Sequence, residues 1–135
     1  MRVTILGQKG GWHVVQLQAA LERRGIVAPC YSIAQLTARI ARGPRLSIGD
    51  SVLDQSDLLF LRGIPGGSLE QVIFRVDAMH CLENSGVRVI NRPTTIERTV
   101  DKYYTSTLLE DAGLPTPRTV VTENLDQALA AFAEL

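Results

Sequence analysis

The feature that most constrains the fold is an alternation of short apolar runs with segments of helical periodicity. The apolar runs lie at residues 2–7, 26–32, 57–63 and 87–91. Between them, apolar side chains recur at helical spacing, as in Val14, Leu17 and Leu21. Strands that alternate with helices predict an α/β layer with a mostly parallel sheet, and right-handed crossovers place helices on both faces. We therefore expect a three-layer, Rossmann-like α/β unit.

Two segments inside this unit are harder to assign. Ser32 can cap a helix over residues 33–42, in which Ile33, Leu36 and Ile40 share one face. The next stretch, residues 43–56, is rich in turn-forming residues and predicts a short, irregular hairpin. A further helix is expected to begin after Ser68, with an apolar stripe that includes Val76 and Met79.

The pattern changes after Asn91. Pro93 suits the first turn of a short helix, and Asp101 can cap a second helix over residues 102–112, which Gly113 would end. We then expect a strand at about residues 118–122 and an alanine-rich helix over residues 125–135. Residues 1–92 therefore read as one complete α/β domain, and residues 93–135 as two linker helices and the start of another domain.

Composition excludes several classes of partner. The chain has 135 residues, with 14 basic and 14 acidic side chains, so no net charge favours nucleic acid or a membrane surface. No apolar run approaches the roughly 20 residues that span a bilayer, and the N-terminus lacks a signal-peptide cleavage site. We expect a cytoplasmic protein without nucleic acid or membrane partners.

Cysteine and histidine do not suggest a metal site. Cys30 and Cys81 are the only cysteines, and they are expected to be free thiols. His13 and His80 have no neighbour at the spacing of a metal ligand set. No Ser-His-Asp or Cys-His arrangement and no pair of carboxylates stands out, so no catalytic residue is predicted.

The first candidate binding loop is GQKGGW, residues 7–12. It lacks the glycine spacing of a dinucleotide fingerprint and of a P-loop. Lys9, Gly10 and Gly11 could still hold a carboxylate or a phosphate at the start of the following helix. The alternative is a plain tight turn between a strand and a helix.

The second candidate loop is RGIPGGS, residues 62–68. Arg62 ends the most apolar strand, and Gly63, Gly66 and Gly67 follow before the next helix. Ligands of open α/β sheets bind at the carboxyl ends of the strands, where a guanidinium can pair with a planar carboxylate. The glycines would let such a ligand approach the backbone. The alternative is an arginine that pairs with a structural acid.

The segment VRVINRPTTIERTVDKYYTSTLLEDAGLPTPRTVV resembles the junction between the two domains of RimK-type ATP-grasp ligases, the α-L-glutamate ligases. The segment LRGIPGGSLEQVIFRVDAMHCLENSGVRVIN resembles the branch that adds glutamate to tetrahydromethanopterin. The resemblance covers essentially the whole chain and implies a pre-ATP-grasp domain followed by the beginning of an ATP-grasp domain.

The resemblance also implies a reaction and its participants. ATP would phosphorylate a small-molecule carboxylate, and the amine of glutamate or a similar amino acid would attack the acylphosphate. ATP and Mg²⁺, or Mn²⁺ in its place, would be the cofactors of the complete enzyme. Lys102, one of only two lysines, matches the family lysine that reaches the nucleotide phosphates.

The family pattern continues beyond the last residue of this chain. A second lysine, a glycine-rich flap, the adenine site and the acidic metal ligands would follow Leu135. We therefore expect this chain to be an N-terminal portion that binds no ATP or metal by itself and is inactive alone. A stand-alone α/β binding module, using residues 93–135 to dimerise, remains the alternative. An unpaired strand at 118–122 invites another chain, so we expect residues 115–135 either to be poorly ordered or to pair between chains, and we expect a homo-oligomer.

Overall fold

The computed structural model describes residues 1–134. Its contacts divide the chain into two compact units, Met1–Thr95 and Ile96–Leu135, and each is described by itself. No helix among residues 1–134 is long and apolar enough to cross a bilayer.

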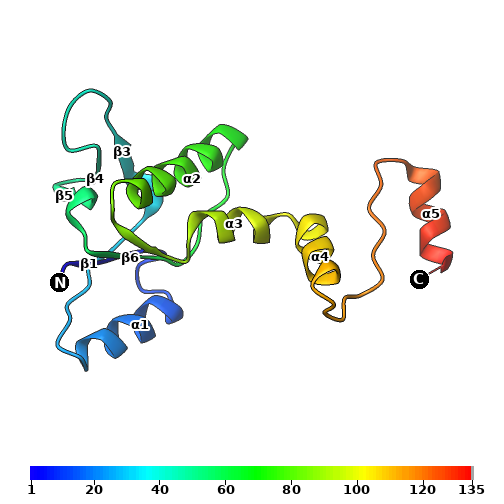
Figure 1. Cartoon of the computed structure of the whole chain (residues 1–135), viewed down its shortest axis with the longest axis horizontal. Coiled ribbons are helices and arrows are strands. Elements are labelled where there is room, and N and C mark those ends of the chain that lie inside the picture. Colours follow the sequence, from blue (N-terminus) through cyan, green and yellow to red (C-terminus); the bar gives the residue numbers. More distant parts are fainter. Residues whose placement is uncertain (135) are drawn as a thin grey trace. The chain divides into compact units, whose positions relative to one another are not determined.

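The first unit is built on a parallel sheet of four strands. These are β1 (Val3–Leu6), β2 (Cys30–Tyr31), β6 (Leu58–Leu61) and β7 (Arg88–Ile90), in the order β2-β1-β6-β7. Helix α1 (Trp12–Glu22) lies on one side of this sheet and α2 (Leu69–Asn84) on the other (Figure 1). The predicted three-layer α/β fold with a mostly parallel sheet is confirmed.

Both faces of the central strands are buried, which explains their continuous apolar sequences. Val3 and Ile5 of β1 pack against Val14 and Leu21 of α1. The alternation of side chains along a strand turns Leu6 to the opposite face, the side of α2. There α2 contributes its own buried stripe, which consists of Val76, Ala78, Met79 and Leu82.

The predicted helix over residues 33–42 is wrong. Ser32 does cap a helical turn, but it is a short 3-10 helix, η1 (Ile33–Gln35). The chain then forms β3 (Leu36–Ala38), which pairs antiparallel with β4 (Leu46–Ile48). The paired residues of β3 and β4 lie 8 to 12 positions apart, so helical periodicity within residues 33–42 does not register the pairing, and the pairing overrides it.

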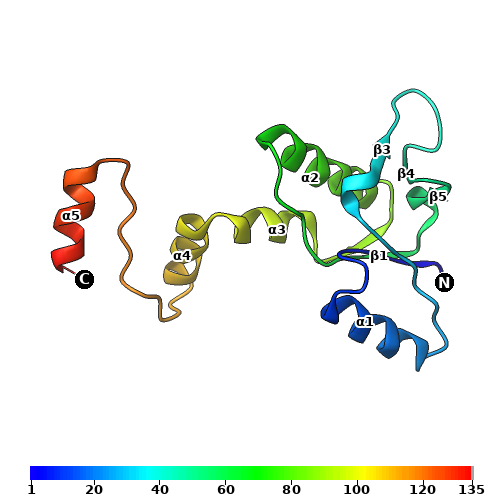
Figure 2. The same cartoon turned by 180° about the vertical axis from the view of Figure 1, so that it is seen from behind.

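A second, antiparallel sheet results, in the order β3-β4-β5. Strand β5 (Ser51–Val52) leads into the short 3-10 helix η2 (Leu53–Gln55), so the predicted irregular hairpin is the second half of a meander. The loop between β3 and β4 projects away from the rest of the unit (Figure 2), and Ile40 within it is 96% exposed.

Helix α2 begins where the sequence predicts. The Ser68 hydroxyl accepts the backbone N–H of Gln71, and the Gln71 side chain accepts the backbone N–H of Ser68. This reciprocal capping box satisfies two N–H groups at the helix start and fixes the end of the preceding loop.

The second unit contains most of α3 (Pro93–Val100), which spans the boundary between the units, and α4 (Lys102–Asp111) and α5 (Leu125–Glu134). Asp101 accepts the Tyr104 N–H at 3.1 Å as the predicted cap, and Gly113 adopts φ +71° after α4. The predicted helix over residues 125–135 is present as far as Glu134; its last residue, 135, lies outside the described part.

The predicted strand at residues 118–122 is wrong for this structure. These residues have no regular secondary structure. A strand needs a partner for its N–H and C=O groups, and no described residue pairs with this segment. Its β-branched sequence therefore marks a strand tendency that this chain does not satisfy.

Candidate functional site

The two candidate loops emerge side by side from one edge of the sheet. Strands β1 and β6 are parallel neighbours, with Leu6 opposite Leu61. Backbone hydrogen bonds of 2.9 Å continue this pairing beyond the strand ends, from Arg62 N to Leu6 O and from Gly7 N to Tyr31 O. The carboxyl ends of β1, β2 and β6 therefore bring residues distant in sequence to a single place.

A cavity of about 490 Å³ lies at this edge. Of the predicted binding residues, Lys9, Arg62 and Gly63 line it, whereas Gly10, Gly11, Gly66 and Gly67 do not. Gly7, Gln8, Ile64 and Pro65 also line it and belong to the two predicted loops. Ser32 and Ile33 line it as well and were not predicted, because they belong to the segment wrongly expected to form a long helix.

Two cationic side chains face this cavity without an internal partner. Neither the Arg62 guanidinium nor the Lys9 ammonium forms a hydrogen bond or ion pair with any of residues 1–134. Both residues are exposed. The structural acid considered as an alternative partner for Arg62 is therefore not found in the described part of the chain, and the guanidinium can reach a ligand.

The first loop is shaped by its glycines. Gly10 has φ +76°, a conformation that residues with a side chain rarely adopt, and Gly11 N donates to Gln8 O at 3.0 Å. Gly11 is also the N-cap of α1. Gly10 and Gly11 thus form the turn that presents Lys9, rather than lining the cavity.

The second loop is held in place by Arg75 of α2, a residue that was not among the predicted site residues. Arg75 is only 8% exposed, and its Nη1 donates to the carbonyl oxygens of Pro65 at 2.7 Å and Gly66 at 3.3 Å. A Cβ at Gly67 would lie 2.5 Å from Gln71 Oε1, so a larger residue there would displace the Gln71 side chain from the capping box. An arginine beside the apolar stripe of α2 was the available signal for this role.

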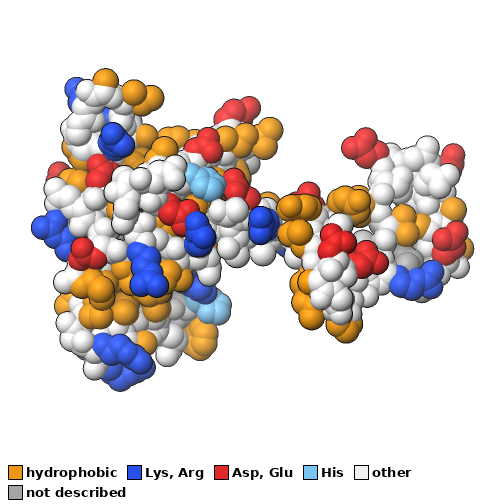
Figure 3. Space-filling view, viewed as in Figure 1, with side chains coloured by type: hydrophobic (Ala, Val, Ile, Leu, Met, Phe, Trp, Pro, Cys, Tyr) orange, Lys and Arg blue, Asp and Glu red, His pale blue; other side chains and the backbone are white. Residues whose placement is uncertain are grey.

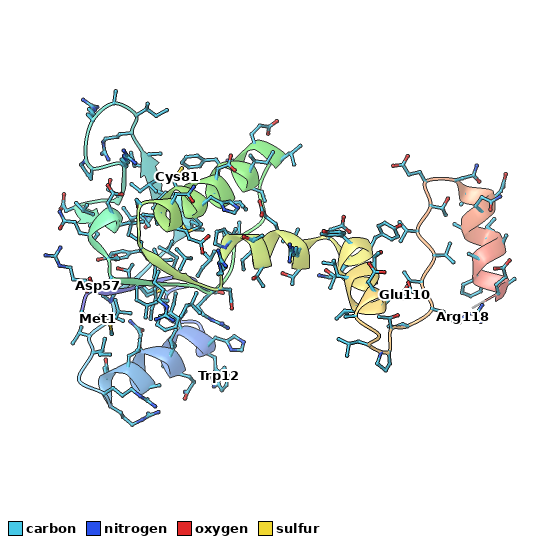
Figure 4. All side chains as sticks on the ribbon, viewed as in Figure 1. Met1, Trp12, Asp57, Cys81, Glu110 and Arg118 are labelled. Atoms are coloured by element: carbon cyan, nitrogen blue, oxygen red, sulfur yellow. The ribbon has the colours of Figure 1, made fainter. Side chains whose placement is uncertain are left out.

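A smaller cavity of about 220 Å³ adjoins Arg62. It is lined by aromatic and polar side chains that include Trp12, His13, Phe60 and Asn91. Trp12 projects outward from the start of α1 (Figure 4) and is 70% exposed. Arg62 lines both cavities.

Cys30 is close to the larger cavity but is not suited to be a nucleophile. Its thiol donates to Gly7 O at 3.8 Å. Partial burial raises the pKa of the Cys30 thiol, although the hydrogen bond to Gly7 and the charge of Lys9 act in the opposite direction. A raised pKa keeps the thiol protonated at neutral pH, and the thiolate is the reactive form.

Lys102 lies in the second unit, at the first position of α4. Its Nζ donates to Thr99 O at 3.1 Å, at the C-terminal end of α3. The carbonyl groups at the C-terminal end of α3 attract the Lys102 ammonium. This attraction partly offsets the unfavourable position of a cation at the N-terminus of α4.

No group of three or more His, Cys, Asp or Glu side chains that could hold a metal ion is present among residues 1–134. One loop presents Lys9 and the other Arg62. Cationic side chains of this kind bind anions rather than metal ions. The donor set of the described residues does not fit a Mg²⁺ site.

No family model matches the chain. Over 83 residues it is 41% identical to the tetrahydromethanopterin:α-L-glutamate ligase of Methanosarcina acetivorans, a match that covers 62% of this chain and 26% of that protein. The RimK domain ATP-grasp protein of Sphaerobacter thermophilus is 25% identical, with a TM-score of 0.72 over 99% of this chain and 46% of that one. The ATP-grasp ligase PsnB, solved with minimal precursor, Mg and ADP, is 19% identical, with a TM-score of 0.68 over 98% of this chain and 51% of that one.

The resemblance to RimK-type ATP-grasp ligases and to tetrahydromethanopterin:α-L-glutamate ligases is confirmed by these matches. The chain spans 26 to 44% of the length of the curated relatives that it matches.

Proposed function

We propose that this chain supplies the substrate-binding part of an ATP-dependent ligase that joins a carboxylate to an amine. The observation that carries the proposal is the pair of unpartnered cations, Lys9 and Arg62, at a cavity on the carboxyl edge of the parallel sheet. Open α/β sheets bind ligands at this edge. The similarity to proteins named as glutamate ligases and ATP-grasp ligases supports the same class of reaction.

In the proposed reaction, a carboxylate oxygen of the substrate attacks the γ-phosphate of ATP and ADP leaves. The amine of glutamate, or of a similar amino acid, then attacks the acyl carbon, and phosphate leaves as the amide forms. Arg62 would hold the carboxylate by two parallel hydrogen bonds, and Lys9 would offset the charge that accumulates on the phosphate.

ATP with Mg²⁺ would supply the phosphoryl group, as the names of the structural relatives suggest. Lys102 is the residue of this chain that we assign to the nucleotide phosphates, on its match to the family pattern. Because the described donor set does not fit a metal, we assign no step to a metal held by this chain and expect the chain alone to be inactive.

The test is the carboxylate dependence of ADP release by the whole protein, with any residues beyond this chain included. With ATP, Mg²⁺, glutamate and a panel of carboxylates, Arg62→Gln should raise the KM for the carboxylate about 10- to 100-fold, because charge-assisted hydrogen bonds are lost. The KM for ATP should change little.

Arg23→Gln is the matched control, since Arg23 follows the end of α1 and lies at the opposite edge of the sheet. If Arg62→Gln and the unmodified protein have equal KM values for the carboxylate, Arg62 does not bind the carboxylate. If no carboxylate stimulates ADP release, the stand-alone binding module becomes the better description.

A further inference from the structure

The first unit contains a larger groove that the proposed reaction does not use. It has a volume of about 1060 Å³ and is lined by the loop that joins β3 to β4, residues 39–45, and by α2, so we call it the α2 groove. Figure 1 and Figure 2 both place this loop on the side of the sheet that carries α2. Cavities for small molecules usually measure about 300 to 1,000 Å³. The α2 groove is therefore large enough for a segment of a protein chain.

Much of the lining of the α2 groove is apolar. Leu46 and Ala78 line it and are buried, which makes this part of the wall firm. Phe74 of α2 and Ile40 of the loop also line it and are 41% and 96% exposed. Exposed apolar side chains that gather in a concave surface are typical of an interaction site.

The loop also gives the α2 groove a cationic rim. Residues 39–45 contain three arginines and no acidic residue. Arg39 donates to Ser47 Oγ at 2.8 Å. The side chains of Arg42 and Arg45 are exposed and form no hydrogen bond or ion pair with any of residues 1–134. Two guanidinium groups are thus available to an acidic partner.

Two carboxylates line the α2 groove as well, and they do not neutralise this rim. Asp54 accepts the backbone N–H groups of Arg45 at 2.6 Å and of Leu46 at 3.0 Å, so it serves to hold the loop. Asp77 is an exposed residue of α2. Three arginines against two aspartates leave the lining with an excess of positive charge.

Helix α5 has the complementary character. Residues 119–134 contain three acidic side chains, Glu123, Asp126 and Glu134, and neither lysine nor arginine. In a chain with no net charge, one exposed loop is therefore purely basic and the last helix purely acidic. The apolar side chains on one face of α5 are 73%, 64% and 86% exposed; they are Leu125, Leu129 and Phe132.

We propose that α5 of one copy of this chain binds in the α2 groove of a second copy. The apolar face of α5 would cover Phe74 and Ile40, and its acidic side chains would lie toward Arg42 and Arg45. Complementary charge steers such an encounter and fixes its orientation, and the apolar contact supplies affinity. Because the helix and the groove are different surfaces, the contact is heterologous. The proposal goes beyond the proposed function and does not depend on it.

The first test is sedimentation of this chain over a range of concentrations, with variants on each side of the contact. Arg42→Glu combined with Arg45→Gln should weaken self-association about 10-fold or more, because the attraction is lost. The second substitution is Gln so that no new anion stands beside Asp54. Asp126→Arg combined with Glu134→Gln should weaken it similarly.

Arg23→Glu combined with Arg24→Gln is the matched control. It changes the net charge by the same amount, after the end of α1, at residues that do not line the α2 groove. Association of the control should equal that of the unmodified chain. Higher salt should weaken association of the unmodified chain, since it screens exposed charges. Association that salt does not weaken would overturn the role of the arginines.

The second test mixes the groove variant with the helix variant. The groove variant keeps an intact α5 and the helix variant keeps an intact α2 groove, so the mixture should form a 1:1 dimer that neither variant forms alone. This recovery would also show that both variants are folded. Cys81 is exposed and lines the α2 groove, so its reaction with a thiol reagent should slow as the dimer forms.

Three results would overturn the proposal. The groove variant may associate as strongly as the unmodified chain, which would mean that α5 packs on another surface, such as α5 of the second copy. The mixture may stay monomeric, or the reactivity of Cys81 may ignore association. None of these results affects the carboxylate site, which is tested by the KM of Arg62→Gln.

Discussion

Gly7 directly follows β1 and lies beside Arg62 and Val14. A Cβ at this position would lie 3.0 Å from Val14 Cγ2 and 3.2 Å from Arg62 Cβ. Contacts this short are strained, so one of the two side chains would have to move. The absence of a side chain at Gly7 therefore allows α1 to pack closely against the strand end and leaves Arg62 beside the cavity.

We expect Gly7→Ala to lower the free energy of unfolding by about 1 to 3 kcal/mol, the usual cost of overpacking. It should also raise the KM for the carboxylate, because Arg62 is displaced. Urea denaturation and the carboxylate dependence of ADP release by the whole protein measure the two effects.

Gly63→Ala is the matched control for Gly7→Ala. Gly63 lines the same cavity, but a Cβ there meets no atom within 4 Å and the φ is not in the left-handed region. Because loss of backbone flexibility alone favours the folded state, Gly63→Ala should not lower stability, and an equal loss in both variants would show that packing at Gly7 is not the cause.

At the scale of elements, α2 determines the shape of the loop between β6 and α2. Its buried Arg75 donates to two loop carbonyls, and its capping box fixes the residue that follows Gly67. A loop with several glycines has high conformational freedom by itself. Hydrogen bonds from a packed helix limit that freedom, so the candidate site depends on a residue that does not line it.

Arg75→Met should therefore loosen this loop while α2 stays folded. We expect a loss of about 1 kcal/mol in unfolding free energy, since water can reach the released carbonyls. Hydrogen exchange at the Gly66 and Gly67 amides should accelerate more than in the rest of the unit. Arg23→Met, an exposed change of the same charge, should leave both quantities unaltered, and unchanged exchange in Arg75→Met would show that the loop is rigid without this contact.

At the scale of the whole molecule, the second unit exposes much apolar surface for its size. Figure 3 shows hydrophobic side chains on its surface around α4. Leu125, Leu129 and Phe132 share one face of α5 and are 73%, 64% and 86% exposed. Val120 and Val121 in the unpaired segment are exposed as well. Apolar surface of this extent favours association.

We expect the chain to self-associate through residues 115–134 as its concentration rises. Sedimentation should show a concentration-dependent increase in mass, and the amides of residues 118–122 should exchange quickly in dilute solution and more slowly on association. Phe132→Glu should reduce association, whereas Val27→Glu, at an 83% exposed position of the first unit, should not. A monomer at all concentrations with slowly exchanging amides at 118–122 would contradict this prediction.

Local signals in the sequence identified most elements correctly. The apolar strands β1 and β6, the capping box at Ser68, the cap at Asp101 and the glycine at 113 all follow from short-range chemistry. The errors occurred where the presence or absence of a neighbouring strand decides the outcome. Residues 36–38 became a strand because β4 lies beside them, and residues 118–122 did not become one because no described strand does.

The candidate site divides in the same way. The sequence by itself determined that Lys9 and Arg62 follow buried strands and are surrounded by glycines, because strand ends and turns depend on the residues within them. Only the tertiary structure decided that they face one cavity with Ser32 and Ile33, that Arg75 braces the second loop, and that Trp12 adjoins Arg62. The physical reason is the parallel sheet, whose register brings the ends of strands far apart in sequence to one edge.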